Sequence, residues 1–109
     1  MSDQRERAVG RNEAMFRSFN EMVEDVAVLE RSDETTFVCE CGDQQCEAMI
    51  RLELDAYETV RAVSTRFIVR PDHVHTEAEV VVERHSDYWV VEKTGAAAEE
   101  ASERDPRSG

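Results

Sequence analysis

Residues 37–54 of this 109-residue chain read FVCECGDQQCEAMIRLEL, and they contain two strand-like runs joined by a polar turn. In the second run, apolar residues alternate with charged ones, which is typical of a strand with one buried face. The apolar positions of this run are Ala48, Ile50, Leu52 and Leu54. Gly42 and Asp43 are turn-forming residues between the two runs. The pattern predicts an antiparallel hairpin with all three cysteines of the chain at its tip.

The cysteines at this tip, Cys39, Cys41 and Cys46, are close enough in sequence to bind one metal ion. Residues two apart on a strand point to the same side, so Cys39 and Cys41 can bind the ion together. The turn that follows brings Cys46 back toward them. Structural zinc takes four ligands in a tetrahedron, usually cysteine sulfur and histidine nitrogen. We therefore predict a structural Zn²⁺ site that takes three ligands from this loop, with iron as the alternative ion.

The fourth ligand has to come from another position. The candidates are His73, His75 and His85, with Asp43 and Glu47 as options within the loop. We rank His73 first, because a proline two residues before it stiffens the chain and ends a strand. His75 ranks second, because it lies two residues further on. His85 is expected in a solvent-exposed turn.

Two other interpretations of the cysteines are weaker. Free cysteines are often small buried apolar residues, but the neighbours of these three are polar, and so polar a segment is not expected in a core. A redox pair favours an electropositive setting that lowers the thiol pKa, whereas this stretch is acidic. An odd number of cysteines without a secretory signal also argues against a disulfide framework.

Upstream of the hairpin, residues 11–31 have the periodicity of an amphipathic helix. Its apolar residues recur three and four positions apart and form one stripe of Met15, Phe19, Met22, Val26 and Leu29. We expect this stripe to pack on the core of the same domain. The same spacing would also suit a helix partner in a dimer, although three heptads are few for a coiled coil.

Downstream of the hairpin, the sequence predicts a short helix over residues 54–63 and a strand that begins at residue 66 and ends at Pro71. A second hairpin is expected over residues 79–93. Together these elements predict an α+β fold, in which a long N-terminal helix packs on a small, mostly antiparallel sheet with a metal-binding hairpin tip.

The chain is expected to form one domain. Residues 11–93 would make up this zinc-binding α+β domain. Residues 1–10 are expected to be a flexible N-terminus, and residues 94–109 to be a disordered tail, because the tail lacks large apolar side chains.

The chain carries a net charge of −12, from 25 acidic and 13 basic residues, and no basic block stands out. Nucleic-acid binding depends on cationic contacts with phosphate, so we predict no nucleic-acid partner. No run reaches the roughly 18 apolar residues that a membrane span requires, so we predict no membrane partner. The charged N-terminus is unlike a secretory signal, and we expect a cytoplasmic protein.

Four segments of the chain, RNEAMFRSFNE, CECGDQQC, RPDH and YWVVEK, resemble a family of small uncharacterised actinobacterial proteins. The resemblance covers residues 11–93. This family carries the same Cys-x-Cys-x4-Cys cluster, a Pro-x-His segment and a Tyr-x-Val-Val-Glu-Lys ending. The resemblance therefore implies a site of Cys39, Cys41, Cys46 and His73. The family often has glycine where this chain has Asp72, and it implies no activity.

The sequence contains no glycine-rich phosphate loop, no nucleophile elbow and no His-Glu-x-x-His motif, and we predict no catalytic residue. The leading hypothesis is a small acidic, zinc-stabilised binding or regulatory module that acts through contacts with a protein partner. One alternative is a metal-dependent enzyme with an open coordination position and Glu40, Asp43 or Glu47 as the base. The other alternative is an acidic inhibitor that mimics nucleic acid.

Overall fold

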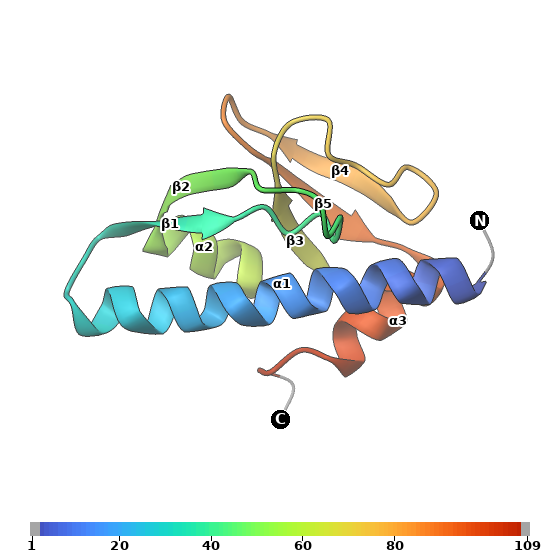
Figure 1. The fold of residues 1–109 in the computed structure, drawn as a ribbon, viewed down its shortest axis with the longest axis horizontal. Helices are drawn as coiled ribbons and strands as arrows, with labels where there is room; N and C mark the ends of the chain where they lie inside the picture. The colour runs from blue at the N-terminus through green and yellow to red at the C-terminus, as the bar shows by residue number, and fades with distance from the viewer. Residues whose placement is uncertain (1–2, 108–109) are drawn as a thin grey trace.

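The computed structural model describes residues 3–107, in which three helices and five strands form an α+β domain (Figure 1). In chain order these elements are α1 (Asp3–Leu29), β1 (Glu34–Val38), β2 (Met49–Glu53), α2 (Leu54–Arg61), β3 (Arg66–Val69), β4 (Glu79–Arg84), β5 (Trp89–Lys93) and α3 (Gly95–Glu103). The predicted fold class is confirmed, although the strands form two small sheets instead of one. None of the helices in residues 3–107 combines the length and the apolar character that crossing a membrane requires.

The first sheet is the predicted hairpin of β1 and β2. The two strands are antiparallel, with Phe37 opposite Ile50. Phe37, Ile50 and Leu52 are buried, whereas Arg51 is exposed, as the alternation of residue types predicts. The ladder ends at Val38, where the chain turns into the loop that carries the cysteines.

The second sheet has the strand order β3-β5-β4, and all neighbouring strands are antiparallel. Strands β4 and β5 form the predicted second hairpin. The buried centre of this sheet consists of Phe67, Ile68, Val69, Val90 and Val91. A backbone hydrogen bond from the N–H of Glu40 to the C=O of Ile68 (2.9 Å) attaches the loop after β1 to β3. The two sheets are thus held together next to the cysteines.

Helix α1 packs on the core as predicted, but its large apolar residues face away from the core, so the prediction of which face is buried is wrong. These residues, called the α1 stripe below, are 51% to 82% exposed and comprise Met15, Phe19, Met22, Val26 and Leu29. The opposite face of α1 is polar and buried, and its buried residues include Glu13, Arg17, Asn20 and Glu24. Periodicity identifies the apolar side of a helix, but it does not identify the neighbour that covers this side.

The buried polar side chains of α1 are paired within the fold. Lys93 of β5 forms ion pairs with Glu13 and with Glu79 of β4. The amide of Asn20 donates to the C=O of Val38 (2.8 Å) and accepts from the N–H of the same residue (2.9 Å). Buried charges and amides are tolerated when they are paired in this way. These specific contacts therefore position α1 against the strands.

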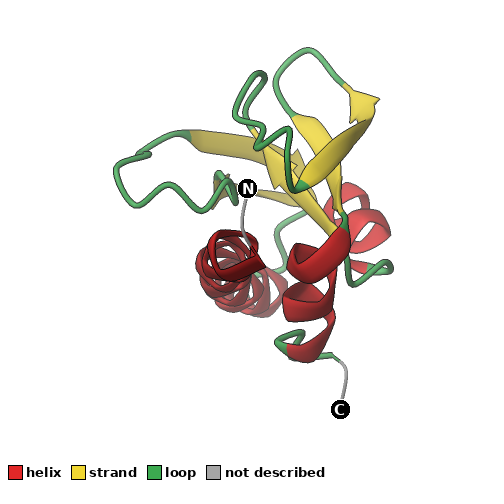
Figure 2. Ribbon diagram, turned by 90° about the vertical axis from the view of Figure 1, so that its right-hand side faces the viewer, coloured by secondary structure: helices red, strands yellow, loops and turns green. Residues whose placement is uncertain are grey.

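The C-terminal segment contains a helix, α3, and for residues 94–107 this corrects the expectation that residues 94–109 form a disordered tail; residues 108 and 109 lie outside the described part of the chain. Helix α3 lies beside α1 (Figure 2). Ala97 and Ala101 are fully buried, and Arg17 of α1 donates to the C=O of Ala101 (2.7 Å). Alanines can pack at a close helix contact although they carry little apolar surface. For this reason, the absence of large apolar residues did not mean disorder.

The N-terminal segment differs from expectation as well. Helix α1 begins at Asp3, so residues 3–10 are helical and do not form the flexible segment expected over residues 1–10; residues 1 and 2 lie outside the described part of the chain. Gly10 is buried where α1 meets α3, and a Cβ atom at this position would lie 2.9 Å from the Cβ of Glu100. The first turns of α1 are therefore part of the helix–helix contact.

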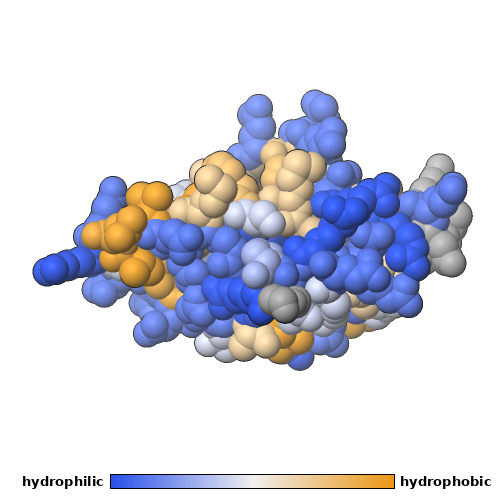
Figure 3. All heavy atoms as spheres, turned by 90° about the horizontal axis from the view of Figure 1, so that it is seen from below, coloured by the Kyte–Doolittle hydropathy of each residue, from blue (hydrophilic) through white to orange (hydrophobic). Residues whose placement is uncertain are grey.

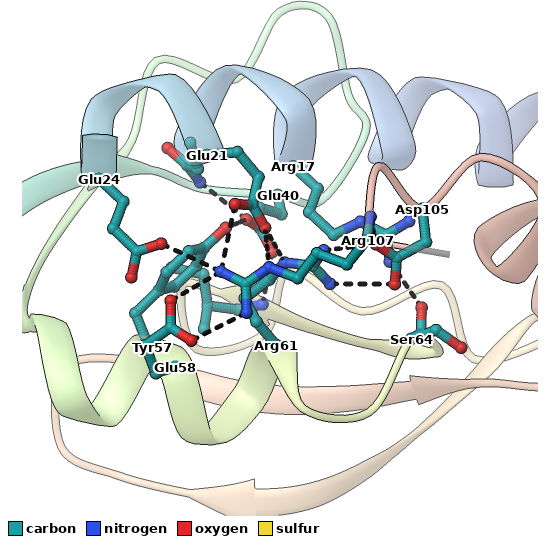
Figure 4. A network of polar contacts seen from close by, with 12 residues as sticks. Arg17, Glu21, Glu24, Glu40, Tyr57, Glu58, Arg61, Ser64, Asp105 and Arg107 are labelled. Atoms are coloured by element: carbon teal, nitrogen blue, oxygen red, sulfur yellow. Dashed lines mark hydrogen bonds and ion pairs between the residues drawn. The ribbon is translucent and has the colours of Figure 1, made fainter. Parts of the chain in front are cut away.

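Charged residues after α3 connect the end of the chain to α1 and α2 (Figure 4). Asp105 accepts a hydrogen bond from Arg61 of α2 (2.6 Å), and both side chains are almost completely buried. Arg107 donates to Glu58 of α2 (2.7 Å) and to Glu24 of α1 (3.1 Å). These ion pairs fix a segment that has few apolar residues of its own.

Candidate metal centre

The three cysteines and His73 come together between the β1–β2 loop and the segment that follows β3. Their potential ligand atoms, three sulfurs and one ring nitrogen, all lie within 4.8 Å of one another. Nδ1 of His73 is 3.5 Å from Sγ of Cys39 and 3.5 Å from Sγ of Cys46. Cys39 and Cys41 are buried, and His73 is the most exposed of the four. This group could hold a metal ion.

The distances match the edges of a zinc tetrahedron. In structural sites zinc binds thiolate sulfur at about 2.3 Å and imidazole nitrogen at about 2.0–2.1 Å, with tetrahedral angles. A sulfur ligand and a nitrogen ligand of one ion are then about 3.5 Å apart. The two distances from His73 to the sulfurs of Cys39 and Cys46 equal this edge. These two edges therefore already have the spacing that a bound ion would require, and all four potential ligand atoms lie within 4.8 Å of one another.

The sharp turn of the loop depends on Gly42. This glycine has a φ of +79°, in the left-handed region that favours glycine. A Cβ atom there would lie 2.7 Å from the Cγ of Glu13 in α1, so the position has no room for a side chain. After the turn, the N–H of Cys46 donates to the C=O of Asp43 (3.0 Å). The predicted turn thus brings the third cysteine back to the first two.

Glu40, which lies between two of the cysteines in sequence, is fully buried and holds the loop from the core side. Its carboxylate accepts hydrogen bonds from the amide of Asn20 (2.9 Å), the hydroxyl of Tyr57 (2.8 Å) and the N–H of Ile68 (3.0 Å). Figure 4 shows Glu40 and Tyr57 together beneath α1. Burial raises the pKa of this carboxyl. Glu40 thereby connects the loop to α1, α2 and β3.

The hydrogen bonds around the sulfurs favour the thiolate form of one cysteine, Cys41. The N–H of Arg70 donates to Sγ of Cys39 (3.2 Å). The hydrogen bond between Cys39 and Cys41 lowers the pKa of Cys41 to about 5 and raises the pKa of Cys39. The thiolate is the form of cysteine that binds metal. These contacts thus favour the metal-binding form of Cys41, whereas the pKa of Cys46 is raised by burial.

His75, the second-ranked ligand, contacts the loop in another way. Its Nε2 lies 2.7 Å from the C=O of Cys41, which is a hydrogen bond if this nitrogen carries the proton. The backbone N–H of His75 donates to Glu79 (3.0 Å). His85 is in the turn between β4 and β5, where its ring stacks on Tyr88 with 4.4 Å between the ring centres. His75 and His85 are not members of the four-residue group.

The two loop carboxylates that were considered as fourth ligands, Asp43 and Glu47, are exposed and do not belong to the group. Asp43 accepts a hydrogen bond from the N–H of Gln45 (2.9 Å) and so shapes the turn. Of the candidates from the sequence, His73 is thus the residue that the structure brings to the three cysteines.

A small hollow of about 250 Å³ opens beside His73. Its lining consists of Cys41, Asp43, Asp72, His73, Val74 and His75. Asp72 has a φ of +71°, which is a conformation that favours glycine. The backbone that presents His73 therefore has a shape that aspartate adopts less readily than glycine.

Sequence reasoning missed the roles of Glu40 and Arg70. The polar loop suggested a segment outside the core, yet Cys39, Glu40 and Cys41 are all buried. Alternation along a strand could have revealed Glu40, because two cysteines on one side put the residue between them on the other. Arg70 acts through its backbone N–H, and no pattern of side chains shows such a contact.

No family model, no curated protein and no solved structure matches this chain. The resemblance to small actinobacterial proteins therefore stays a prediction. The assignment of the site rests on the geometry of the four side chains, which form a group that could bind a metal ion.

Proposed function

We propose that this protein is a small zinc-stabilised binding module that acts through contacts with a protein partner. The observation that carries the proposal is the convergence of Cys39, Cys41, Cys46 and His73 within 4.8 Å. Three thiolates and one imidazole are a common ligand set of structural zinc sites. Thiolates also select zinc over hard cations such as magnesium and calcium, which prefer oxygen ligands.

The ligand set favours a structural role for the metal over a catalytic one. A catalytic zinc ion has three protein ligands and leaves the fourth position to water, whereas four protein ligands would fill the tetrahedron here. A catalytic site would also need a base close to the metal-bound water. Glu40 is not available as this base, because its carboxylate is buried on the core side and hydrogen-bonded to Asn20, Tyr57 and Ile68.

A zinc ion at this position would join the two sheets. The three cysteines belong to the loop of the first sheet, and His73 follows β3 of the second sheet. Structural zinc contributes an apparent 10–16 kcal/mol or so to the folding of zinc-finger peptides at neutral pH. This protein also has an apolar core centred on Phe67 and Val90. The ion would therefore stabilise the arrangement of the two sheets without being the sole source of the fold.

The binding role is supported by the surface of the protein. Apolar side chains outside the α1 stripe are exposed as well, including Met49 (51%) on β2 and Val80 (50%) on β4. A contiguous apolar patch with a polar rim, such as the α1 stripe, is typical of protein interaction sites, whereas single exposed apolar side chains are common on any surface. The net charge of −12 argues against nucleic acid as the partner.

The metal can be tested by native mass spectrometry and elemental analysis of the purified protein. We expect one zinc ion per chain, and we expect Cys39→Ser, Cys46→Ser and His73→Ala to lose it. His75→Ala is the matched control, because His75 lies two residues from His73 and its ring contacts a backbone carbonyl. This variant should keep the ion.

Wild-type protein without metal, or with a disulfide among these cysteines in reducing buffer, would contradict the proposal. If the purified protein contained iron instead of zinc, the proposed site would stand and only the identity of the ion would change. Loss of metal from His75→Ala together with its retention in His73→Ala would move the fourth ligand to His75.

A further inference from the structure

The α1 stripe is a continuous apolar surface on the outside of the molecule. Its members are exposed by 57% (Met15), 51% (Phe19), 65% (Met22), 53% (Val26) and 82% (Leu29). Seen from below, apolar side chains cover the left end of the molecule, where α1 ends, and paler ones continue toward the middle (Figure 3). Monomeric proteins rarely expose a large contiguous apolar patch without a function for it.

The spacing of the stripe suits another helix. Its members follow one another at intervals of 4, 3, 4 and 3 residues, which is the heptad spacing of two helices that pack along their length. We propose that the α1 stripe is the interface of a homodimer, in which α1 of one copy packs antiparallel on α1 of a second copy.

A two-fold axis through the middle of the stripe makes it complementary to itself. With the axis between Phe19 and Met22, the Phe19 ring of one copy lies opposite Met22 of the other. Met15 of one copy then lies opposite Val26 of the other. A two-fold interface uses the same patch on both subunits, with each contact present twice. Large and flexible methionine side chains thus face the ring and the branched residue, which allows close packing.

The charges beside the stripe favour the antiparallel orientation. Arg11 and Asp25 are exposed along one edge of the stripe, and Glu30 is exposed along the other. In a parallel pair, Asp25 of one copy would lie beside Glu30 of the other, and two carboxylates repel each other. In the antiparallel pair with its axis between Phe19 and Met22, Asp25 of one copy lies beside the uncharged Ser18 of the other. The repulsion between Asp25 and Glu30 is therefore absent from this orientation.

The size of the stripe is sufficient for a modest dimer. Five large side chains at these exposures present roughly 500 Å² of apolar surface, at about 150–200 Å² for each fully exposed side chain. Two copies would bury roughly 1,000 Å² together, which is the lower end of specific interfaces. We therefore expect a dissociation constant in the micromolar range. Two copies with a net charge of −12 each repel one another at low salt. The expected dissociation constant therefore applies to physiological ionic strength, where the Debye length is about 8 Å and the repulsion is screened.

Sedimentation equilibrium of the full chain, from low micromolar to submillimolar concentration, tests the dimer. The wild type should shift from the mass of one chain to the mass of two chains. Phe19→Glu should remain a monomer over the whole range, because it places a charge at the centre of the interface. Val80→Glu is the matched control, since Val80 on β4 is 50% exposed and Phe19 is 51% exposed. This control should dimerise like the wild type.

Charge reversal tests the orientation. In the antiparallel dimer, Asp25 lies beside an uncharged serine, so Asp25→Arg should change the dissociation constant by less than about threefold. In a parallel dimer, Asp25→Arg would strengthen association instead, because the new arginine would lie beside Glu30.

The proposal stands on α1 alone and is separate from the metal site. Circular dichroism and zinc content should be the same in Phe19→Glu and in the wild type, because Phe19 is on the surface. A wild type that stays monomeric at submillimolar concentration would overturn the dimer, and so would a Phe19→Glu variant that dimerises like the control. A stronger dimer in Asp25→Arg would overturn the antiparallel orientation.

Discussion

The loop that carries the cysteines and the segment that ends the chain both fix parts of the protein that are distant in sequence, but they do so by different means. The loop meets His73 with three sulfurs that lie within eight residues of one another. The final segment, residues 95–107, packs alanines against the rest of the fold and pairs Asp105 and Arg107 with acidic and basic side chains of α1 and α2. The contact of the loop depends on cysteine, a rare residue type, whereas the contacts of the final segment depend on alanine and charged residues, which are common.

This difference decides what a sequence reveals. Three cysteines in a short polar stretch have few explanations, so the loop attracts attention at once. Alanine, glutamate and arginine are frequent in solvent-exposed and disordered segments, so the final segment looks dispensable. Its contribution is visible only in three dimensions, where Ala97 and Ala101 are fully buried.

The strongest test of this comparison is to remove the final segment. Deletion of residues 95–109 would leave the buried Arg61 without Asp105, and Arg17 without the C=O of Ala101. Removal of one partner from a buried charged pair costs about 3–5 kcal/mol, and small domains have only about 5–15 kcal/mol of stability. We expect the shortened protein to be largely unfolded at 37 °C, as measured by circular dichroism and urea titration.

A shorter deletion provides the control. Removal of residues 106–109 keeps α3 and Asp105 and takes away the ion pairs of Arg107 with Glu21, Glu24 and Glu58, which are partly exposed, so the loss should be about 1 kcal/mol or less. If both deletions left the stability unchanged, the final segment would be the dispensable tail that its composition suggests.

Local patterns predicted most of the strands, whereas the orientation of α1 could not be predicted. The alternation in residues 49–53 follows from which face of the strand is buried, and this information is local. The buried face of α1 depends on partners far along the chain: Lys93 lies 80 residues after Glu13, and Ala101 lies 84 residues after Arg17. In a sequence, such charged residues look like the solvent face of an amphipathic helix.

The candidate metal site was more accessible to sequence reasoning than the core. The three cysteines were evident from their spacing, and His73 could be ranked above His75 because of its place after the end of a strand. The buried position of Glu40 on the core side of the loop was not evident from the sequence, because it depends on hydrogen-bond donors from α1, α2 and β3. Potential metal ligands can be recognised from their residue type. The hydrogen-bond donors that a buried carboxylate needs come from several elements of the fold and cannot be recognised in this way.

The second test addresses the loop. We expect Cys39→Ser to lower the free energy of unfolding by an amount on the order of 4 kcal/mol, a size that is typical of the loss of a metal. Cys46→Ser should cost less, because Cys46 is less buried and does not accept the hydrogen bond that Cys39 accepts from Arg70. Urea titration with and without a chelator measures the effect.

The chelator should reduce the wild type to nearly the stability of Cys39→Ser and should hardly affect the variant. A wild type that is insensitive to the chelator would mean that hydrogen bonds around Glu40 hold the loop without a metal. The loop and the final segment would then both be held in place by ordinary side-chain contacts, without a metal ion.

The third test concerns the close contact between α1 and α3. In Gly10→Ala, the new Cβ would meet the Cβ of Glu100 at 2.9 Å and the backbone oxygen of Ala97 at 3.3 Å. Alanine favours a helix over glycine by about 1 kcal/mol, but overpacking costs typically 1–3 kcal/mol. We expect a net loss of about 1 kcal/mol in thermal or urea unfolding. Gln4→Ala, an exposed position on the same helix, should change the stability by about 0.5 kcal/mol at most. Stabilisation by Gly10→Ala would show that α3 does not press against α1.

The smallest expected effect concerns Arg107, whose hydrogen bond lowers the pKa of Glu58 to about 2. Because this pKa lies below the ordinary value of about 4.3, the ionised carboxylate stabilises the folded state. This stabilisation is complete above pH 4.3 or so and is lost as the pH falls toward the folded pKa.

Arg107→Gln should therefore cost about 1 kcal/mol or less at neutral pH, since the pair is partly exposed, and the difference from the wild type should shrink as the pH falls from about 4.3 toward 2. Urea titrations at several pH values measure this difference. Arg51→Gln breaks the exposed pair of Arg51 with Glu34 on the first hairpin and serves as the control. Arg107 contacts Glu24 and Glu58 at once, so its loss should cost more than the loss of Arg51. If the two variants behaved alike at every pH, the end of the chain would be held by the alanines of α3 and not by its charges.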